Sequence, residues 1–581
     1  MNWQTELNSS LSWILTALFW VILCFSVVMI ALKQTTFGQK FWHIASPSIN
    51  RRNSIKIIVM LLVLFTMILL EVRFSVLNSF FYNGLYSSMQ ELDADKFWFF
   101  AKLNALLVLV QVIHSIADYF LQQVFEIRWL ESLNKVLVKR WLENKKYYRL
   151  KYEKDLPDNI DQRIEQDARE FISSTVKIVR GMINSILTTI EFTIILWSLS
   201  GILSLFGLNI EKGVVFFIYA FIILATLMSV WIGHPLIKLN FNKEKLNGDY
   251  RYSLIRVRDN AESIAFYHGE KKEQLFLQHK FTQIIHNRWA IVLKMLGLDG
   301  FNSGVTRVAK LLPLMLQAPR FFTGQIKLGD MHQTVQAFNR LMTALSFFRL
   351  FYEQFTLYQA RLNRLYGFMK KMDDLDNQEF YQPFLCSHRV SLKDFGIKDE
   401  KGRVLLNNLN INLVNGDALL IQGASGTGKT SLLKAIAGIY PFETIGIAEH
   451  PCTGSLFLPQ RPYMPQGTLR EAICYPNINP NHPDLIQTME DCALGKYIYA
   501  LDHINDWQVI LSPGELQRVA FIRILLTKPD VVFLDETTEY LLYRKIRYHL
   551  PEMIILSIGH RSTLQQFHNK QLELDICLLC E

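Results

Sequence analysis

Gly423-Ala424-Ser425-Gly426-Thr427-Gly428-Lys429-Thr430 follows the apolar run Ala418–Gln422 and precedes a segment with the apolar spacing of a helix. Strand, glycine-rich loop and helix in this order define the Walker A phosphate-binding loop. The glycines let the backbone bend so that successive N–H groups surround phosphate oxygens. Lys429 would supply a positive charge near the β and γ phosphates, and the Thr430 hydroxyl would bind Mg²⁺. The alternative, a glycine loop that only connects strand and helix, leaves the complete motif unexplained.

A second apolar strand, Val531-Val532-Phe533-Leu534-Asp535, ends in a carboxylate and is followed by Glu536. A Walker B strand places an aspartate toward Mg²⁺ at this point. We therefore expect Asp535 to bind the metal and Glu536 to activate the attacking water. A strand-end cap is the structural alternative for Asp535, and the presence of a Walker A loop in the same region argues against it.

The composition of the whole chain excludes a single compact soluble enzyme. The chain has 581 residues, of which 50% are apolar and only 19% charged, with a mean hydropathy of +0.15 and a net charge of +9. These values are typical of a chain partly dissolved in lipid, with Lys and Arg gathered on the cytoplasmic side. The basic balance therefore predicts no nucleic-acid partner. The seven cysteines indicate neither a disulfide framework nor a metal site with two paired knuckles. Cys577 and Cys580 form one isolated CxxC, for which a redox or metal site is the alternative.

The first span is the clearest, because residues 11–32 contain no charge and are long enough to cross a bilayer. We expect it to remain as an anchor rather than to be removed as a signal peptide. The connection 33–56 is basic and contains no acidic residue, which places it in the cytoplasm. Further spans are predicted at 57–76, 97–121, 183–205 and 214–232, with weaker ones at 292–316 and 335–355.

These spans predict an organisation in which seven crossings from an outer start bring the remaining chain to the cytoplasm. The predicted boundaries are 1–56 for the first span with its basic link, 57–365 for the membrane domain, 366–388 for a linker and 389–581 for the nucleotide-binding domain. The last part consists of short apolar runs separated by Gly, Pro and Asn, as in a soluble α/β domain.

Three further motifs resemble ATPase elements of ABC transporters. Leu511-Ser512-Pro513-Gly514-Glu515-Leu516-Gln517-Arg518 resembles the signature motif, with Pro and Glu where LSGGQ has Gly and Gln. Ile554 through His560 resembles the strand that carries the switch histidine, and Phe457-Leu458-Pro459-Gln460 resembles the Q-loop. The resemblance implies that His560 senses the γ-phosphate, that Gln460 reaches Mg²⁺, and that the signature contacts ATP held by a partner subunit. The implied residues are Gly423, Ala424, Ser425, Gly426, Thr427, Gly428, Lys429, Thr430, Ser431 and Gln460 for ATP, Ser512, Gly514 and Glu515 for the partner's ATP, Thr430, Gln460 and Asp535 for Mg²⁺, and Glu536 and His560 for catalysis.

The membrane half resembles the bacterial BacA/SbmA-like transporters fused to an ATPase, which are related to the peroxisomal fatty-acyl (subfamily D) ABC transporters. Stretches that carry the resemblance are 78–85, 147–150, 158–164 and the coupling-like region 249–270. The resemblance implies an exporter-type helical membrane domain with an extra N-terminal span and a C-terminal P-loop ATPase domain. It also implies a homodimer in a bacterial inner membrane whose cargo is an amphipathic peptide, a corrinoid-like or an acyl compound.

The chain departs from the family pattern after the Walker B strand. Thr537-Thr538-Glu539-Tyr540-Leu541-Leu542 replaces the usual Ala-Thr-Ser-Ala-Leu-Asp, so the D-loop aspartate is missing. Because that loop helps to position the attacking water, an alternative function is a membrane-anchored nucleotide-binding regulator with impaired hydrolysis.

Several ionisable residues fall within or beside the predicted spans, among them Glu71, His114, Asp118 and Glu191. A charge at membrane depth costs at least about 2.5 kcal/mol, so such groups face a watery cavity or one another. Glu191 lies between apolar runs on both sides and is our candidate for contact with cargo or a proton. The alternative for several of these residues is a position at the membrane interface.

Overall fold

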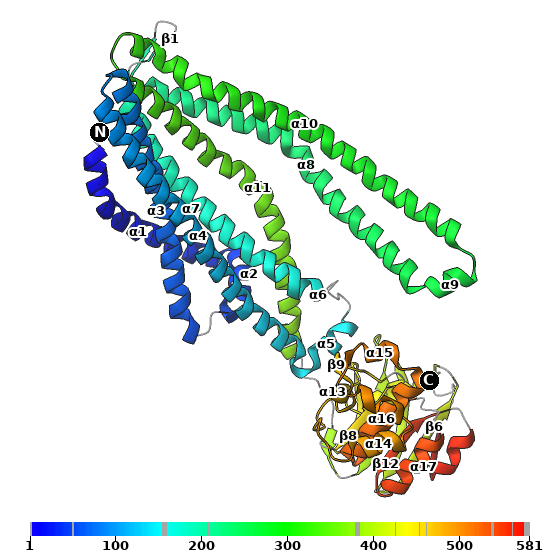
Figure 1. The fold of residues 1–581 in the computed structure, drawn as a ribbon. Coiled ribbons are helices and arrows are strands. Elements are labelled where there is room, and N and C mark those ends of the chain that lie inside the picture. Colours follow the sequence, from blue (N-terminus) through cyan, green and yellow to red (C-terminus); the bar gives the residue numbers. More distant parts are fainter. Residues whose placement is uncertain are drawn as a thin grey trace. The chain divides into compact units, whose positions relative to one another are not determined.

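The computed structural model describes residues 3–48, 51–153, 160–201, 203–205, 208–377, 384–387, 389–424, 426–451, 454–459, 462–535, 540–559 and 562–574. The chain divides into two compact units, residues 1–376 and 377–581. The first is helical and the second is built on β-sheets (Figure 1). The predicted linker 366–388 contains the end of the last long helix and a short strand that joins the second unit.

Long helices form the first unit because its sequence has extended apolar stretches, and α8 and α10 continue through Pro235, Pro313 and Pro319. Their bounds are α1 Trp3–Gln34, α2 Thr36–Ala45, α3 Arg51–Gln90, α4 Ala94–Leu142, α7 Ala168–Leu199, α8 Gly213–Asp259, α10 Glu270–Phe322 and α11 Leu328–Asn377, with the short helices α5 Lys146–Arg149, α6 Ile160–Gln162 and α9 Ala261–Phe266. Helices α1, α3, α4 and α7 lie side by side in one bundle (Figure 1).

Five helical segments among the described residues are long and apolar enough to cross a membrane. They coincide with the first five predicted spans, including the extra N-terminal one, except at the end of 183–205. The two weaker predicted spans lie in α10 and α11, which are helical throughout but more polar. One boundary was wrong: the span predicted for 183–205 ends as a helix at Leu199, and a short hairpin of β1 (Leu203–Leu205) and β2 (Leu208–Ile210) follows.

Helices α8 and α10 form a long antiparallel hairpin that separates from the bundle along most of its length (Figure 1). One end is held by the bundle core, where Val214 and Ile218 of α8 and Ala309 of α10 pack with Phe192 and Phe338. The coupling-like residues 249–270 form the opposite tip, made of the end of α8, α9 and the first turn of α10.

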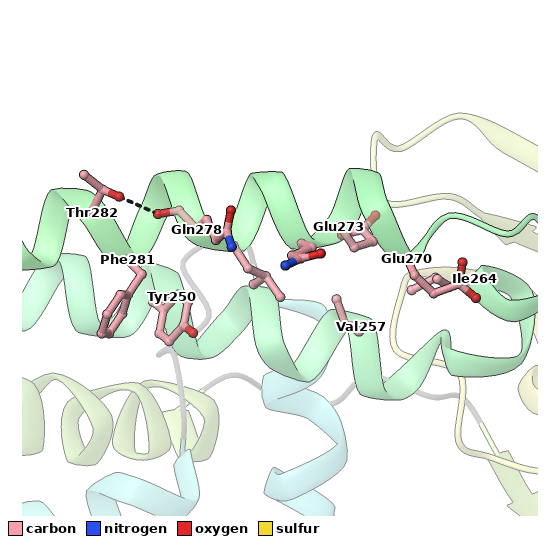
Figure 2. A pocket seen from close by; sticks show the side chains of 10 residues that line it. Tyr250, Val257, Ile264, Glu270, Glu273, Gln278, Phe281 and Thr282 are labelled. Carbon is pink, nitrogen blue, oxygen red and sulfur yellow. Dashed lines mark hydrogen bonds between the residues drawn. The ribbon is translucent and has the colours of Figure 1, made fainter.

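A groove of about 560 Å³ runs along this tip between α8 and α10 (Figure 2). The rings of Tyr250 and Phe281 meet across it with their centroids 5.6 Å apart. Phe266, the last residue of α9, and Tyr267, which follows it, are 76% and 86% exposed. The tip therefore presents aromatic side chains that the helical unit itself does not cover.

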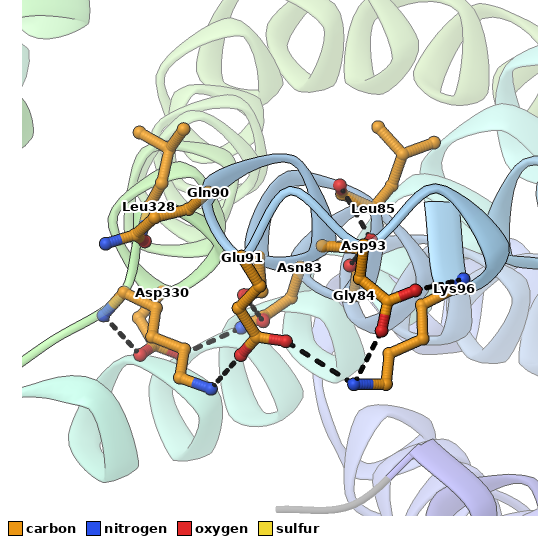
Figure 3. A network of polar contacts seen from close by, with 12 residues as sticks. Asn83, Gly84, Leu85, Gln90, Glu91, Asp93, Lys96, Leu328 and Asp330 are labelled. Carbon is orange, nitrogen blue, oxygen red and sulfur yellow. Dashed lines mark hydrogen bonds and ion pairs between the residues drawn. The ribbon is translucent and has the colours of Figure 1, made fainter. Parts of the chain in front are cut away.

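Ion pairs join the turn between α3 and α4 to the segment that begins α11 (Figure 3). Glu91, in the turn between α3 and α4, pairs with Lys327 at 2.5 Å and with Lys96 at 3.6 Å. Asp93 caps α4 and pairs with Lys96 at 2.9 Å. These contacts tie the α3–α4 turn to the start of α11, and the hydrogen bond with Lys327 lowers the pKa of the Glu91 carboxyl.

Two sheets form the scaffold of the second unit. The first contains five parallel strands in the order β13-β6-β12-β11-β8, and the second has the order β3-β7-β4-β5. Their bounds are β3 Phe384–Cys386, β4 Val390–Lys398, β5 Val404–Leu413, β6 Ala418–Gly423, β7 Thr444–His450, β8 Ser455–Leu458, β11 Val531–Asp535, β12 Ile554–Ile558 and β13 Lys570–Leu574. A further two-stranded sheet pairs β9 Gly467–Thr468 with β10 Ile504–Asn505. Strands β11 and β12 are buried on both faces. This burial explains why their sequences are continuous apolar runs, as is typical of parallel strands.

The helices of the second unit belong to two hydrophobic cores. Helix α12 (Lys429–Ile436) packs between the two sheets, with Leu432 and Leu433 buried beside Leu419 and Ile421. The other core gathers α13 Leu469–Ile473, α14 Leu485–Asp491, α15 Trp507–Ile510, α16 Pro513–Thr527 and α17 Tyr540–His549. The architecture is an α-helical unit with several apolar spans followed by an α/β unit with a parallel sheet, as the sequence predicts.

Candidate nucleotide site

The parallel sheet brings the predicted nucleotide residues to one edge. Strands β6, β12 and β11 are neighbours, and β8 pairs with β11. Because parallel strands share a direction, their carboxyl ends meet at the same edge. The phosphate loop follows β6, Asp535 ends β11, Pro459 follows β8 and Gly559 follows β12.

The loop after β6 has the backbone that the glycines predict. Gly426 and Gly428 have φ angles of +88° and +84°, in the left-handed region where a side chain would be strained. Gly423 is restricted by space as well, since a Cβ there would lie 2.4 Å from the Leu574 carbonyl oxygen. Gly428 directly precedes α12, so the loop opens onto a helix N-terminus, which favours anions.

Lys429 and Thr430 take up the positions that phosphate and metal binding require. The Lys429 ammonium donates to the carbonyl oxygens of Gly423 and Ala424, at 2.9 and 2.6 Å, so it lies across the loop. The Thr430 hydroxyl lies 3.3 Å from a carboxylate oxygen of Asp535, which is 8% exposed. A hydroxyl and a carboxylate brought together supply the hard oxygen ligands that Mg²⁺ prefers, so these two residues fit the predicted metal.

Four predicted site residues lie outside the described residues: Ser425, Gln460, Glu536 and His560. Their roles stay predictions. Thr427 is described, and its hydroxyl donates to the Ala424 carbonyl at 2.9 Å within the loop.

The signature residues begin α16. This helix packs in the hydrophobic core that also contains α13, α14, α15 and α17, whereas α12 packs in the other core. Ser512 is the N-cap of α16, and it forms a capping box with Glu515 in which each residue satisfies a backbone N–H of the other. Gly514 lies in the first turn. The Glu515 carboxylate also forms an ion pair with the Lys496 ammonium at 2.6 Å. That contact and the Ser512 N–H outweigh partial burial and lower the pKa of Glu515 to about 2, so the carboxylate is charged at neutral pH.

Arg523 is a structural residue of this site that sequence reasoning missed. It lies on α16 with 6% exposure and donates to the carbonyl oxygens of Tyr463, Ala472 and Ile473, at 2.9, 2.7 and 3.2 Å. It thereby fixes the segment that follows the predicted Q-loop to α13 and α16. The available signal was a single arginine on the apolar face of 516–526.

In the helical unit, Glu191 belongs to a polar cluster with the extra N-terminal helix. The Trp13 indole N–H donates to the Glu191 carboxylate at 2.8 Å, and the guanidinium of Arg73 lies 5.5 Å over the Trp13 ring. Arg73 is 3% exposed and pairs with Glu6 at 2.9 Å while donating to Ser10. The cluster therefore joins α1 to α3 and α7.

The other predicted intramembrane charges have separate surroundings. Asp118 pairs with Arg180 at 2.6 Å, which satisfies two charges at once. Glu71 is exposed on α3, and one ring nitrogen of His114 lies 3.0 Å from the Met67 carbonyl oxygen. The structure thus brings Glu191 together with α1 and not with these groups.

Comparison with known proteins agrees with both halves of this description. The family profile "ABC transporter transmembrane region 2" matches residues 43–322, and "ABC transporter" matches residues 406–539. An ABC transporter ATP-binding protein of Haemophilus influenzae is 85% identical over the full length of both chains. The inner membrane ABC transporter ATP-binding protein YddA of Escherichia coli is 30% identical over 90% of this chain and 95% of its own. The human lysosomal cobalamin transporter ABCD4 is 26% identical over 82% of this chain and 85% of its own.

A P-loop ATPase unit that follows an apolar helical unit in the chain is the organisation of a transport ATPase. The chain belongs to the ABC transporter family, with one transmembrane region and one ATPase domain, and it is related to subfamily D. The relatives are named as transporters, so the alternative of a regulator receives no support. The transmembrane profile begins at residue 43, so α1 and most of α2 precede it.

Proposed function

We propose that two copies of this chain form an ATP-driven transporter that moves an amphipathic solute across the inner membrane. The observation that carries the proposal is the separation of the two halves of the ATP site. The Walker A loop precedes α12 in one core, whereas Ser512 starts α16 in the other. One chain has one of each, so a complete pair of sites needs a second copy in a head-to-tail arrangement.

In the proposed mechanism each residue acts on the triphosphate or on the attacking water. The loop N–H groups and Lys429 bind the phosphates, and Ser512 and Gly514 of the second copy close the site over the γ-phosphate. Glu536 polarises the water, and His560 senses the γ-phosphate. Thr430, Gln460 and Asp535 would hold Mg²⁺, which neutralises charge on the β and γ oxygens.

The surface of the helical unit supports a second copy as well. Along the middle of the α8–α10 hairpin, Trp231, Phe241, Trp289, Leu293 and Leu296 are exposed. A hairpin that leaves its own bundle with so many exposed apolar side chains needs lipid or protein to cover it. We propose that the partner covers part of it. ATP-driven closure would then move the hairpin and alternate the access of the cargo path.

We propose an amphipathic cargo from the resemblance to subfamily D and from the human relative, whose name specifies cobalamin. Corrinoids, acyl compounds and amphipathic peptides are the candidate classes. Glu191 is proposed to contribute to the cargo path, and its hydrogen bond to Trp13 makes α1 part of the wall of that path. The inner membrane is proposed from the name of the E. coli relative and from the apolar helices.

A complementation experiment tests the shared ATP site. Lys429→Ala and Ser512→Arg each inactivate both sites of a homodimer. Co-expression of the two variants produces heterodimers with one intact site, made of Lys429 from one chain and Ser512 from the other. We expect vanadate-sensitive ATPase activity in purified heterodimers and none in either parent.

A matched control combines Lys429→Ala with Glu536→Gln. Both residues serve the same Walker A and B half-site, so every heterodimer carries two defective sites and no activity should return. If heterodimers of the Lys429→Ala and Ser512→Arg chains assemble but show no ATPase activity, the proposal of a shared ATP site is contradicted. Cargo stimulation of the wild type by cobalamin, palmitoyl-CoA or a cationic peptide in proteoliposomes then identifies the cargo class.

A further inference from the structure

A second cavity in the helical unit is apart from the nucleotide site and from the proposed cargo path. It has a volume of about 770 Å³ and lies between α1, α2, α3, α4 and α7. That volume falls within the range of roughly 300–1,000 Å³ that is typical of ligand pockets. One wall is formed by the apolar side chains of Phe25, Met29, Leu61, Leu64 and Phe65.

The cavity extends through about one leaflet of a bilayer. Its lining on α3 runs from Lys56 to Phe65, which is about 14 Å at 1.5 Å per residue. Half of a hydrocarbon core is about 15 Å. Lys56 ends the basic connection that the positive-inside rule places in the cytoplasm, so the polar mouth lies at the cytoplasmic interface.

Cationic side chains dominate the polar part of the lining: Lys56, Arg128, Lys135 and Arg180. Arg180 and Lys135 are each paired with a carboxylate, at 2.6 and 2.5 Å. Within the part of the chain that the structure describes, Lys56 and Arg128 have no carboxylate at ion-pair distance. The carboxylate of Glu131, which pairs with Lys135, also lines the cavity. Lys56 and Arg128 are therefore the lining cations without a direct ion pair in the part of the chain that the structure describes.

Hydrogen bonds hold the turn after α2 against α4 at this mouth. The Trp129 indole N–H donates to the Ser48 hydroxyl at 3.1 Å, and the Ser132 hydroxyl donates to the Ser48 carbonyl at 2.6 Å. Trp129 and Trp42 both line the cavity, and tryptophan is enriched at the membrane interface. The cavity is thus built in advance of any ligand, with its polar end at headgroup level.

We propose that this cavity binds an anionic phospholipid of the cytoplasmic leaflet, with an acyl chain against α3 and the phosphate beside Lys56 and Arg128. The two cations without a direct ion pair favour an anionic headgroup, and the depth of the cavity fits an acyl chain of one leaflet. The site is separate from Glu191, which follows Arg180 by eleven residues on α7 and so lies about 16 Å further along that helix. The proposal rests on the membrane orientation of the proposed function.

Photo-cross-linking in nanodiscs tests this site on the full-length protein. Phosphatidylglycerol and phosphatidylethanolamine that carry a diazirine on one acyl chain are compared at equal density. Cross-links are mapped by mass spectrometry to the α3 segment 57–65. We expect phosphatidylglycerol to label this segment preferentially, and Lys56→Gln with Arg128→Gln to weaken labelling about 30-fold, as expected for the loss of two interfacial cations.

Two further variants separate the site from general attraction of anionic lipid. Leu61→Trp fills the cavity from its apolar wall without a change of charge and should also weaken labelling. Lys139→Gln with Lys151→Gln removes two exposed cations that do not line the cavity, and it should leave labelling unchanged. ATPase activity, measured on the same samples, reports separately on the proposed transport function.

Four results would overturn the proposal. Equal labelling by the two lipids contradicts selection by charge. An equal loss in the Lys139 and Lys151 control shows that the lipid responds only to the overall surface potential. Displacement of the probe by inorganic phosphate would show that the site binds a free anion. Displacement by palmitoyl-CoA at lower concentrations than by unlabelled phosphatidylglycerol would show that the site binds a cargo.

Discussion

Substitution of Arg523 by methionine tests how the ATPase unit holds the segment after the predicted Q-loop. Methionine retains most of the apolar length and removes every donor. The carbonyl oxygens of Ala472 and Ile473 then stay buried without a partner, whereas that of Tyr463 lies nearer the surface. Each unsatisfied buried carbonyl costs about 1–3 kcal/mol. Removal of a buried charge offsets part of this cost, so we expect a loss of about 3 kcal/mol.

Charge and donor geometry are separated by a second variant. Arg523→Lys keeps one positive charge but offers a single ammonium in place of a planar fork, so it should lose about 1–2 kcal/mol. Burial lowers the pKa of Arg523 to about 10, which leaves the guanidinium charged at neutral pH. Its unfolded pKa is higher still, so both states are protonated between pH 6 and 8 and the loss should not change across that range.

The assay is pulse proteolysis of the full-length protein in increasing urea, with ATPase-unit fragments followed by immunoblot. Arg544→Met, an exposed arginine on α17, is the control and should change the free energy of unfolding by less than about 0.5 kcal/mol. If Arg523→Met costs no more than this control, or if its cost varies between pH 6 and 8, the reasoning is refuted. At a temperature where the variant is folded, cargo-stimulated ATPase should fall more than basal ATPase.

Three further predictions concern single contacts. Glu515→Gln removes the ion pair to the exposed Lys496 and should lower the free energy of unfolding by about 1–2 kcal/mol at pH 7. Since the pKa of Glu515 in the folded state is depressed to about 2, the difference between variant and wild type should vanish as the pH falls from 4.5 toward 2. A difference that stays constant in urea titrations over this pH range would contradict the prediction. Burial lowers the pKa of His568, so the ATPase unit should lose stability as the pH falls below about 6.5, and His568→Gln should flatten this slope in the same titration. Trp13→Phe removes the donor to Glu191 and should lower the thermal midpoint of the helical unit by about 2 °C, whereas Trp20→Phe, on the exposed side of the same helix, should not.

The fold could be predicted because its signals are local. A charge-free stretch such as 11–32 indicates a span by itself, and the run of apolar strand, glycine loop and helix at 418–436 indicates a P-loop by itself. The predicted strand 531–535 is β11 with the same bounds. Where local signals compete, a boundary was missed. The partly apolar residues 200–205 extend the fourth predicted span, yet the helix ends at Leu199 and a hairpin follows.

The sequence predicts which residue types form the site and their order along the chain. It does not predict how these residues lie relative to one another. The sequence does not show that Thr430 and Asp535, 105 residues apart, lie 3.3 Å from each other, because that distance depends on the order of the strands in the sheet. The same holds for Arg523, whose three acceptors lie at least 50 residues earlier in the chain.

The sequence alone determined the class of elements, the membrane character of the first half and the chemistry of the phosphate loop, since each depends on residues within one helix or one turn. Only the tertiary structure decided that Glu191 binds Trp13 of the extra helix, that Arg523 anchors the segment after the Q-loop, and that Lys56 and Arg128 face one apolar cavity. Such contacts join distant parts of the chain, and their existence depends on how whole helices pack, which no local pattern specifies.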